Sequence, residues 1–140
     1  YREPRTRFVA EFLGSSNIFA GQVVAAKNGL IAIETPAGEF TVSPSHARPL
    51  KTGDSATFVV AGDRMQLTRE PGGNGLNRMR TSVVGEEFVG ASAVIHLEGP
   101  AGADIKVQKS HDELAELDLS PGAQIWLSWT PESSYLLPSE

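Results

Sequence analysis

Two serine–histidine pairs are the first residues in this chain whose types and spacing could do chemistry. The pairs are Ser45-His46 and Ser110-His111, and a serine activated by histidine is a common nucleophile. A catalytic triad is a spatial arrangement, however, and adjacent residues seldom direct their functional groups at each other. Ser110 also stands three residues before Glu113, which is the spacing of a helix capping box. We therefore predict that Ser110 caps a short helix over 111–117.

Metal and phosphate chemistry have less support. The chain has three histidines and no cysteine, and His46, His96 and His111 are too far apart in sequence to form a local ligand cluster. No glycine-rich loop ends in Gly-Lys-Ser or Gly-Lys-Thr, so the phosphate-binding loop of nucleotide hydrolases is absent from the sequence. We expect the acidic pair Glu86-Glu87 to be solvated surface rather than a proton donor, which would need an apolar environment that raises its pKa. We expect no catalytic residue, metal or cofactor in this chain, and predict that it is not an enzyme by itself.

Charge and composition exclude further classes. The chain of 140 residues has 12 Lys and Arg against 17 Asp and Glu, a formal net charge of −5, which disfavours a nucleic-acid clamp. Its ten aromatic residues (two Trp, two Tyr and six Phe) are not interleaved with the arginines, as a single-strand binding groove would require. No apolar run approaches the roughly 20 residues of a membrane-spanning helix. The chain begins at Tyr1 without a methionine, so we expect it to be part of a longer protein.

The elements that must position these residues are short strands. Apolar runs recur between turn residues at the spacing of an all-β protein, and Asn28-Gly29 suits the tight turn of a hairpin over 18–34. The fold class predicted is therefore all-β, with at most one or two short helices. The further strands expected are 39–42, 56–60, 65–67, 83–84, 93–97, 105–107, 125–129 and 135–137.

The two halves of the chain resemble each other. The run 34–38 (Glu-Thr-Pro-Ala-Gly) matches 98–102 (Glu-Gly-Pro-Ala-Gly), and the residues that follow match as well. The matched pairs are Phe40 with Ile105, Val42 with Val107, Ser45 with Ser110, and His46 with His111. We interpret the repeat as two small β modules, 18–69 and 81–140, that pack together because neither is large enough to bury a core alone. The glycine-rich stretch 70–80 is the predicted linker.

Trp126 is placed unusually for a tryptophan. Ile125, Leu127 and Trp129 would share the core face of their strand, which leaves Trp126 on the polar face. A large aromatic side chain on a polar face is typical of a contact surface. We expect a contact between the two halves rather than with another protein.

The N-terminal run carries the most specific pattern. A tyrosine and a proline precede Phe-Val-Ala, Phe, Gly and Asn at fixed spacing, here Tyr1, Pro4, Phe8-Val9-Ala10, Phe12, Gly14 and Asn17. This pattern resembles the segment that follows the nucleotide-binding domain in the ATPase subunits of bacterial ABC importers. In that family the segment leads into the transport-associated OB (TOBE) domain. The pattern is most similar to the spermidine/putrescine branch, and iron and sugar-phosphate importers share it.

The remainder of the chain resembles the same family more loosely. Phe88-Val89-Gly90 is similar to the Phe-x-Gly that opens the second module, and 122–132 to its closing strand and turn. The family usually has Arg-Pro-Glu after the middle strand of the first module, whereas this chain keeps the acid at Asp63 but has Ala61 and Gly62 before it. The resemblance implies two small OB-like β-barrel modules preceded by a connector, 1–17, from an ATPase domain.

The resemblance also implies a function. The chain would be the C-terminal regulatory or dimerisation domain of the ATP-binding subunit of an importer, with a second copy of that subunit and the membrane subunits as partners. ATP and Mg would be used by the parent chain, and the location would be peripheral, on the cytoplasmic face of the inner membrane. A soluble fragment with no nucleic-acid partner is expected.

A different function stays open. Related OB-like domains bind molybdate through backbone amides and short polar side chains, and Ser15-Ser16-Asn17 before a strand is similar to that arrangement. The alternative is therefore a small-ligand or oxyanion-binding module, or a domain that takes a small regulatory ligand. The candidate interface or ligand positions are Phe12, Gly14, Ser15, Ser16, Asn17, Asp63, Arg64 and Trp126.

Overall fold

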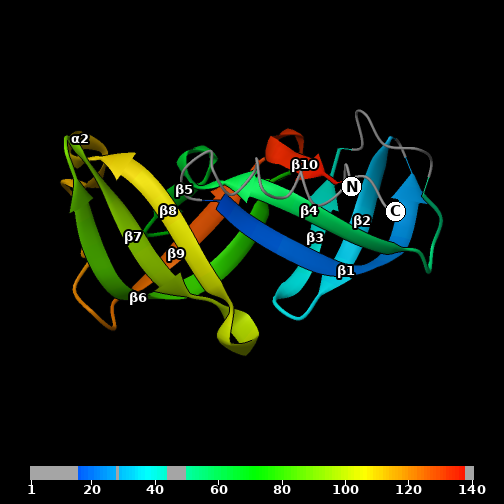
Figure 1. Cartoon of the computed structure of the whole chain (residues 1–140), viewed down its shortest axis with the longest axis horizontal. Helices are drawn as coiled ribbons and strands as arrows, with labels where there is room; N and C mark the ends of the chain where they lie inside the picture. The colour runs from blue at the N-terminus through cyan, green and yellow to red at the C-terminus, as the bar shows by residue number, and fades with distance from the viewer. Residues whose placement is uncertain (1–15, 28, 44–49, 138–140) are drawn as a thin grey trace, which may run out of the picture.

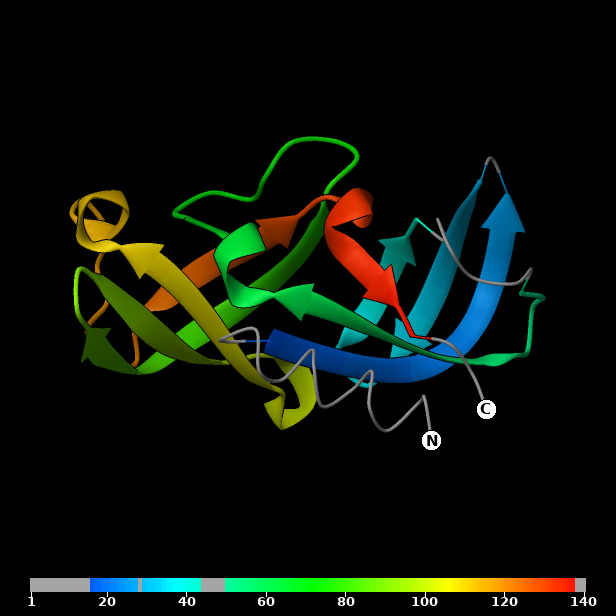
Figure 2. The ribbon, with the colours of Figure 1, turned by 45° about the horizontal axis from the view of Figure 1, so that its top comes forward.

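The computed structural model describes residues 16–27, 29–43 and 50–137, and these residues form two five-stranded antiparallel sheets. The sheets lie side by side along the long axis of the described residues (Figures 1 and 2). The strands are β1 (Ser16–Lys27), β2 (Leu30–Thr35), β3 (Gly38–Val42), β4 (Ser55–Ala61), β5 (Gln66–Thr68), β6 (Asn77–Val89), β7 (Ser92–Glu98), β8 (Asp104–Ser110), β9 (Gln124–Trp129) and β10 (Ser134–Leu136). The predicted all-β fold class is confirmed.

Helical structure in the described part of the chain is short. One α-helix, α2 (His111–Leu114), accompanies three single-turn 3-10 helices, η1 (Gly62–Arg64), η2 (Pro100–Gly102) and η3 (Pro131–Ser133). None of these helices is long and apolar enough to cross a membrane. The predicted capping box is confirmed, because the Glu113 N–H donates to Ser110 Oγ at 3.3 Å and the Ser110 N–H donates to Glu113 Oε1 at 3.0 Å. The helix is one turn long and ends at Leu114, three residues before the end of the predicted range.

The two sheets repeat one plan. The first sheet has the strand order β10-β4-β1-β2-β3 and the second has the order β5-β9-β6-β7-β8. Each long first strand shifts register with its partner at a matched place, between Val23 and Ala25 in β1 and between Val83 and Gly85 in β6. The expected hairpin over 18–34 is present as the antiparallel pair β1 and β2.

The order of the strands shows that the halves exchange their last strands. β5 follows β4 in the chain but pairs with β9 of the second sheet, and β10 follows β9 but pairs with β4 of the first sheet. Strand pairing therefore crosses the predicted modules 18–69 and 81–140, whose bounds as folding units stay a prediction. Each sheet is complete only because the other half of the chain supplies its fifth strand.

The hydrophobic core also joins the two halves of the chain. Buried apolar side chains from both sheets form one cluster, and Trp129 of β9 lies where the two sheets meet. Its ring is stacked on Phe19 of β1 at 6.0 Å between centroids and tilted against Phe40 of β3 at 5.0 Å. Because Phe19 also stacks on Phe58 of β4, a tryptophan from the second half completes the aromatic core of the first.

Gly21 allows β1 to curve closely over its neighbour. A Cβ added at Gly21 would lie 1.9 Å from the carbonyl oxygen of Glu34 in β2. No side chain can occupy that space without moving the backbone. The sequence therefore needs glycine at this position of β1, where the strand passes from one pairing partner to the next.

Candidate functional site: the junction between the sheets

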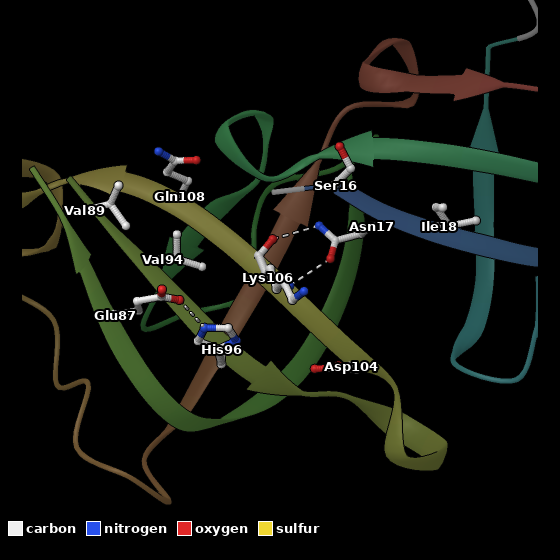
Figure 3. Close-up of a pocket in the computed structure, with 10 residues that line it drawn as sticks. All are labelled: Ser16, Asn17, Ile18, Glu87, Val89, Val94, His96, Asp104, Lys106 and Gln108. Atoms are coloured by element: carbon white, nitrogen blue, oxygen red, sulfur yellow. Dashed lines mark hydrogen bonds and ion pairs between the residues drawn. The ribbon is translucent and has the colours of Figure 1, made fainter. Parts of the chain in front are cut away.

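Asn17 connects the first sheet to the edge of the second. It lies at the start of β1 with 3% of its surface exposed. Its Oδ1 accepts a hydrogen bond from the Lys106 N–H at 2.8 Å, and its Nδ2 donates to the Lys106 carbonyl at 2.8 Å. Figure 3 shows both bonds between β1 and β8. The Asn17 side chain thus pairs with the β8 edge as another peptide group would.

Asn77 makes the same connection in the opposite direction. It lies at the start of β6 with 6% of its surface exposed. Its Oδ1 accepts from the Thr41 N–H at 2.8 Å, and its Nδ2 donates to the Thr41 carbonyl at 2.9 Å. Thr41 lies on β3, which is the edge strand of the first sheet, as β8 is of the second. We call Asn17 and Asn77 the reciprocal asparagines.

The reciprocal asparagines matter because the bonds are inside the protein. A typical hydrogen bond contributes about 1 kcal/mol net, whereas a buried donor or acceptor left without a partner costs about 1–3 kcal/mol. Each amide satisfies one backbone donor and one backbone acceptor at a strand edge. The two halves are therefore held in register by directional bonds as well as by the shared apolar core.

The 3-10 turns add further contacts across the junction. The Lys109 Nζ donates to the carbonyl of Asp63 in η1 at 3.0 Å, and the Ser43 N–H donates to the carbonyl of Pro131 in η3 at 3.2 Å. Each of these 3-10 turns thus contacts the other half of the chain at or beside its edge strand. The exchanged strand, β5 after η1 and β10 after η3, begins directly after the turn. Lys109 is buried with 7% of its surface exposed, and its contact uses the backbone of Asp63 rather than its carboxylate.

A cavity of about 730 Å³ opens beside the Asn17–Lys106 pair. Its walls come from the start of β1 and from the outward faces of β6, β7 and β8, as Figure 3 shows. Glu87 and His96 form an ion pair at 3.3 Å on one wall when the histidine is protonated. Asp104 and Lys106 contribute one charge of each sign on the other. The lining is therefore mixed in charge, with apolar patches that include Val94.

The cavity is lined by charged and polar groups that can contact a ligand. Groups of three or more metal-ligating side chains are absent from the described residues. The carboxylates with displaced pKa values lie outside this cavity, near α2. Hydrogen bonds from Ser110 lower the pKa of Glu113, and the hydroxyl and N–H of Ser120 lower the pKa of Asp118. The first interaction belongs to the helix capping box and the second to a turn after the helix, and both carboxylates are exposed.

The structure places the predicted site residues in three places. Ser16 and Asn17 line the cavity, whereas Asp63 and Arg64 are exposed on η1. Trp126 is half-buried on the outward face of β9, opposite Thr68 of β5 and Arg80 of β6 in the strand register. Phe12, Gly14 and Ser15 lie outside the described residues. The expected contact of Trp126 between the halves stays a prediction, and its neighbour β5 does come from the first half.

Sequence reasoning missed Asn77, Thr41 and Lys106. The signal was present, because Thr41 lies between the matched residues Phe40 and Val42, and Lys106 lies between Ile105 and Val107. The offset between the runs 34–38 and 98–102 would align Asn17 with Thr81, whereas the matched register shifts of β1 and β6 align Asn17 with Asn77. The sequence repeat alone therefore does not identify the pair of asparagines.

Comparisons with known proteins found a domain family, relatives and a solved structure that are similar to this chain. Residues 62–137 match the family model described as TOBE domain. A "Spermidine/putrescine import ATP-binding protein PotA" of Frankia alni is 32% identical over 99% of this chain and 31% of its own length. Another with this name, from Acidothermus cellulolyticus, is 27% identical over 98% of this chain and 36% of its own length. The chain thus spans about a third of the curated relatives it matches.

A solved structure shares the fold. It superposes with a TM-score of 0.77 at 22% identity and covers 88% of this chain and 96% of its own. Its title describes the cytoplasmic molybdate-binding protein ModG in a form with molybdate bound. At this identity the likeness establishes the fold alone.

Replacing either reciprocal asparagine tests the junction. We predict that Asn17→Ala and Asn77→Ala each lower the free energy of unfolding by about 1–3 kcal/mol, because each leaves a backbone donor and acceptor at a strand edge without a partner. Urea unfolding followed by tryptophan fluorescence measures the change. Asn74→Ala, in the exposed part of the linker, is the matched control and should change stability by less than about 0.5 kcal/mol. Equal effects at Asn17 and Asn74 would rule out the junction role.

Proposed function

The chain belongs to the TOBE domain family, and from this membership we propose that it is an accessory domain of the ATP-binding subunit of an ABC importer of the spermidine/putrescine type. The resemblance found in the sequence is confirmed at the level of the family. The observation that carries the proposal is the similarity, along 98–99% of the chain, to import ATP-binding proteins of which it spans about a third.

The proposed role is contact and regulation rather than catalysis. The parent chain would bind ATP and Mg, and this domain would meet its counterpart in a second copy of the subunit. The membrane subunits would be engaged through the rest of the parent chain. The location that follows is peripheral, on the cytoplasmic face of the inner membrane.

The architecture suits such a role. A domain that transmits a signal from one binding surface to another must move as one rigid body. The exchanged strands β5 and β10 join the two halves so that they can move together. The tip of the β6–β7 hairpin leaves Phe88 67% and Val89 47% exposed. An apolar tip of this kind supports a contact with another protein surface.

A chimera tests the proposed function. We predict that this chain can replace the matching third of the Frankia alni relative and preserve ATP-dependent uptake of labelled spermidine in a host lacking its own polyamine importer. The matched controls are the relative with that third deleted and a chimera carrying Asn17→Ala together with Asn77→Ala. Uptake equal to that of the deletion would contradict the proposal, provided the chimera is produced at the level of the parent.

The fold shared with ModG favours a second candidate function, binding of a tetrahedral oxyanion. Two observations oppose it at the junction: the amide of Asn17 is engaged by Lys106, and the carboxylates of Glu87 and Asp104 line the cavity. Calorimetric titration with molybdate, tungstate and sulfate separates the two functions. We predict no heat of binding, and saturable binding at micromolar oxyanion would replace the leading proposal with the alternative.

A further inference from the structure

The outward face of the second sheet has a tryptophan beside an arginine. Arg80 of β6 is paired with Trp126 of β9, and Trp126 is paired in turn with Thr68 of β5. Directly paired residues point to the same side of a sheet. The neighbours Ile125 and Leu127 belong to the buried core, so the row of Thr68, Trp126 and Arg80 faces outward. Trp126 is half-buried and Arg80 is exposed.

Arg78 points to the same side as Arg80, because side chains alternate along a strand. Its Nη1 donates a hydrogen bond to the Gly72 carbonyl at 3.1 Å, which uses one of the five N–H donors of the guanidinium group. Within the described part of the chain, Arg80 makes no hydrogen bond or ion pair. Both arginines are exposed, so most of their donors are open to a binding partner.

No carboxylate among the described residues neutralises these two charges. The one ion pair within 4 Å in that part of the chain joins Glu87 and His96. Arg69, which directly follows Thr68, donates from Nη2 to the carbonyl of Glu116 at 2.7 Å, and this acceptor is neutral as well. The row and the residues next to it therefore have three positive charges that no described carboxylate neutralises, in a chain whose formal net charge is −5.

The first sheet shows that the fold does not require these side chains. Ala20 of β1 and Arg80 of β6 each follow one of the reciprocal asparagines by three residues. Ala20 is paired with Thr57 of β4, as Arg80 is paired with Trp126 of β9. The same row of the same strand arrangement is thus built from alanine and threonine in one sheet, and from arginine and tryptophan in the other.

We propose that Arg78, Arg80 and Trp126 form a docking surface for an extended acidic segment of another protein. Tryptophan and arginine are the residues that most often dominate the binding energy of protein interfaces. Arg78 and Arg80 are two residues apart on a strand, which is a separation of about 7 Å. Carboxylates two residues apart on an extended segment have the same separation, and each can pair with one guanidinium group through two parallel hydrogen bonds.

A short segment fits the charge of this protein better than a long polyanion does. The three residues lie within about 10 Å of one another, since neighbouring strands are about 4.8 Å apart. This distance is close to the screening length of about 8 Å at physiological ionic strength. A nucleic acid or an anionic membrane would also meet carboxylates beyond the patch, such as Glu98, which is paired with Ser82. The excess of acidic residues would repel such a partner.

Fluorescence anisotropy of the full chain with a labelled peptide tests the docking surface. The probe is a fluorescein-labelled peptide of alternating glutamate and serine that contains one phenylalanine, and the control peptide has glutamine in place of glutamate. We expect saturable binding of the glutamate peptide and no binding of the glutamine peptide. Docking at this face does not rest on the function proposed above, so peptide binding and uptake by the chimera can fail separately.

Variants of the chain locate the binding. Arg80→Gln should weaken it by about fivefold, which is the contribution of one partly exposed arginine–carboxylate pair. The matched control, Lys51→Gln, removes another exposed positive charge and should leave the affinity unchanged. Trp126→Thr copies the row of the first sheet and should also weaken binding. If this variant does not fold, the unaltered chain suffices, because the NMR signal of the Trp126 indole N–H should shift on adding the peptide while that of the buried Trp129 stays in place.

Other results would overturn the assignment of this face. Failure of the glutamate peptide to bind would do so, and so would equal losses in Arg80→Gln and Lys51→Gln, which would indicate attraction by overall charge alone. Tighter binding of oligothymidine or of phosphatidylglycerol vesicles than of the peptide would assign the face to a nucleic acid or a membrane. An unshifted Trp126 signal with the peptide bound would place the binding site elsewhere.

Discussion

The pairing of an asparagine side chain with a strand edge, made once from each half, is the interaction on which the rest of this structure depends. Asn17 holds the backbone of Lys106 and Asn77 holds that of Thr41. An edge strand normally exposes backbone groups that can recruit another chain. Here an asparagine from the other half of the same chain satisfies these backbone groups at one residue of an edge strand in each sheet. The 3-10 turns and the exchanged strands make further contacts between the halves.

This interaction also shapes the cavity beside it. The amide of Asn17, which faces the cavity wall, is already engaged in holding β8. The remaining charged groups of the cavity are of both signs, and Lys109 uses the backbone of η1 to close the second sheet. The accessory role that we propose needs surfaces that contact other proteins.

Local patterns in the sequence predicted most of the strands, the hairpin and the capping box, because each depends on residues close in the chain. They predicted only 83–84 of β6, which spans Asn77–Val89 and begins within the expected linker. Ser110 and Glu113 are an example: their spacing alone determines the contact. The exchange of β5 and β10 could not be predicted, since the choice of partner for a three-residue strand depends on which edge is open in the folded protein. Asn17 was singled out as a ligand position, and its contact with Lys106 became visible only when the edge of β8 was placed beside β1.

The central claim is that the two repeated halves fold as one unit. Differential scanning calorimetry of the full chain tests it most directly, because a cooperative unit unfolds in one transition whose calorimetric and van't Hoff enthalpies agree. We predict a single transition with a ratio of about 1 between the two enthalpies. Two resolved transitions, or a ratio near 2, would show that the halves unfold separately and would contradict the account.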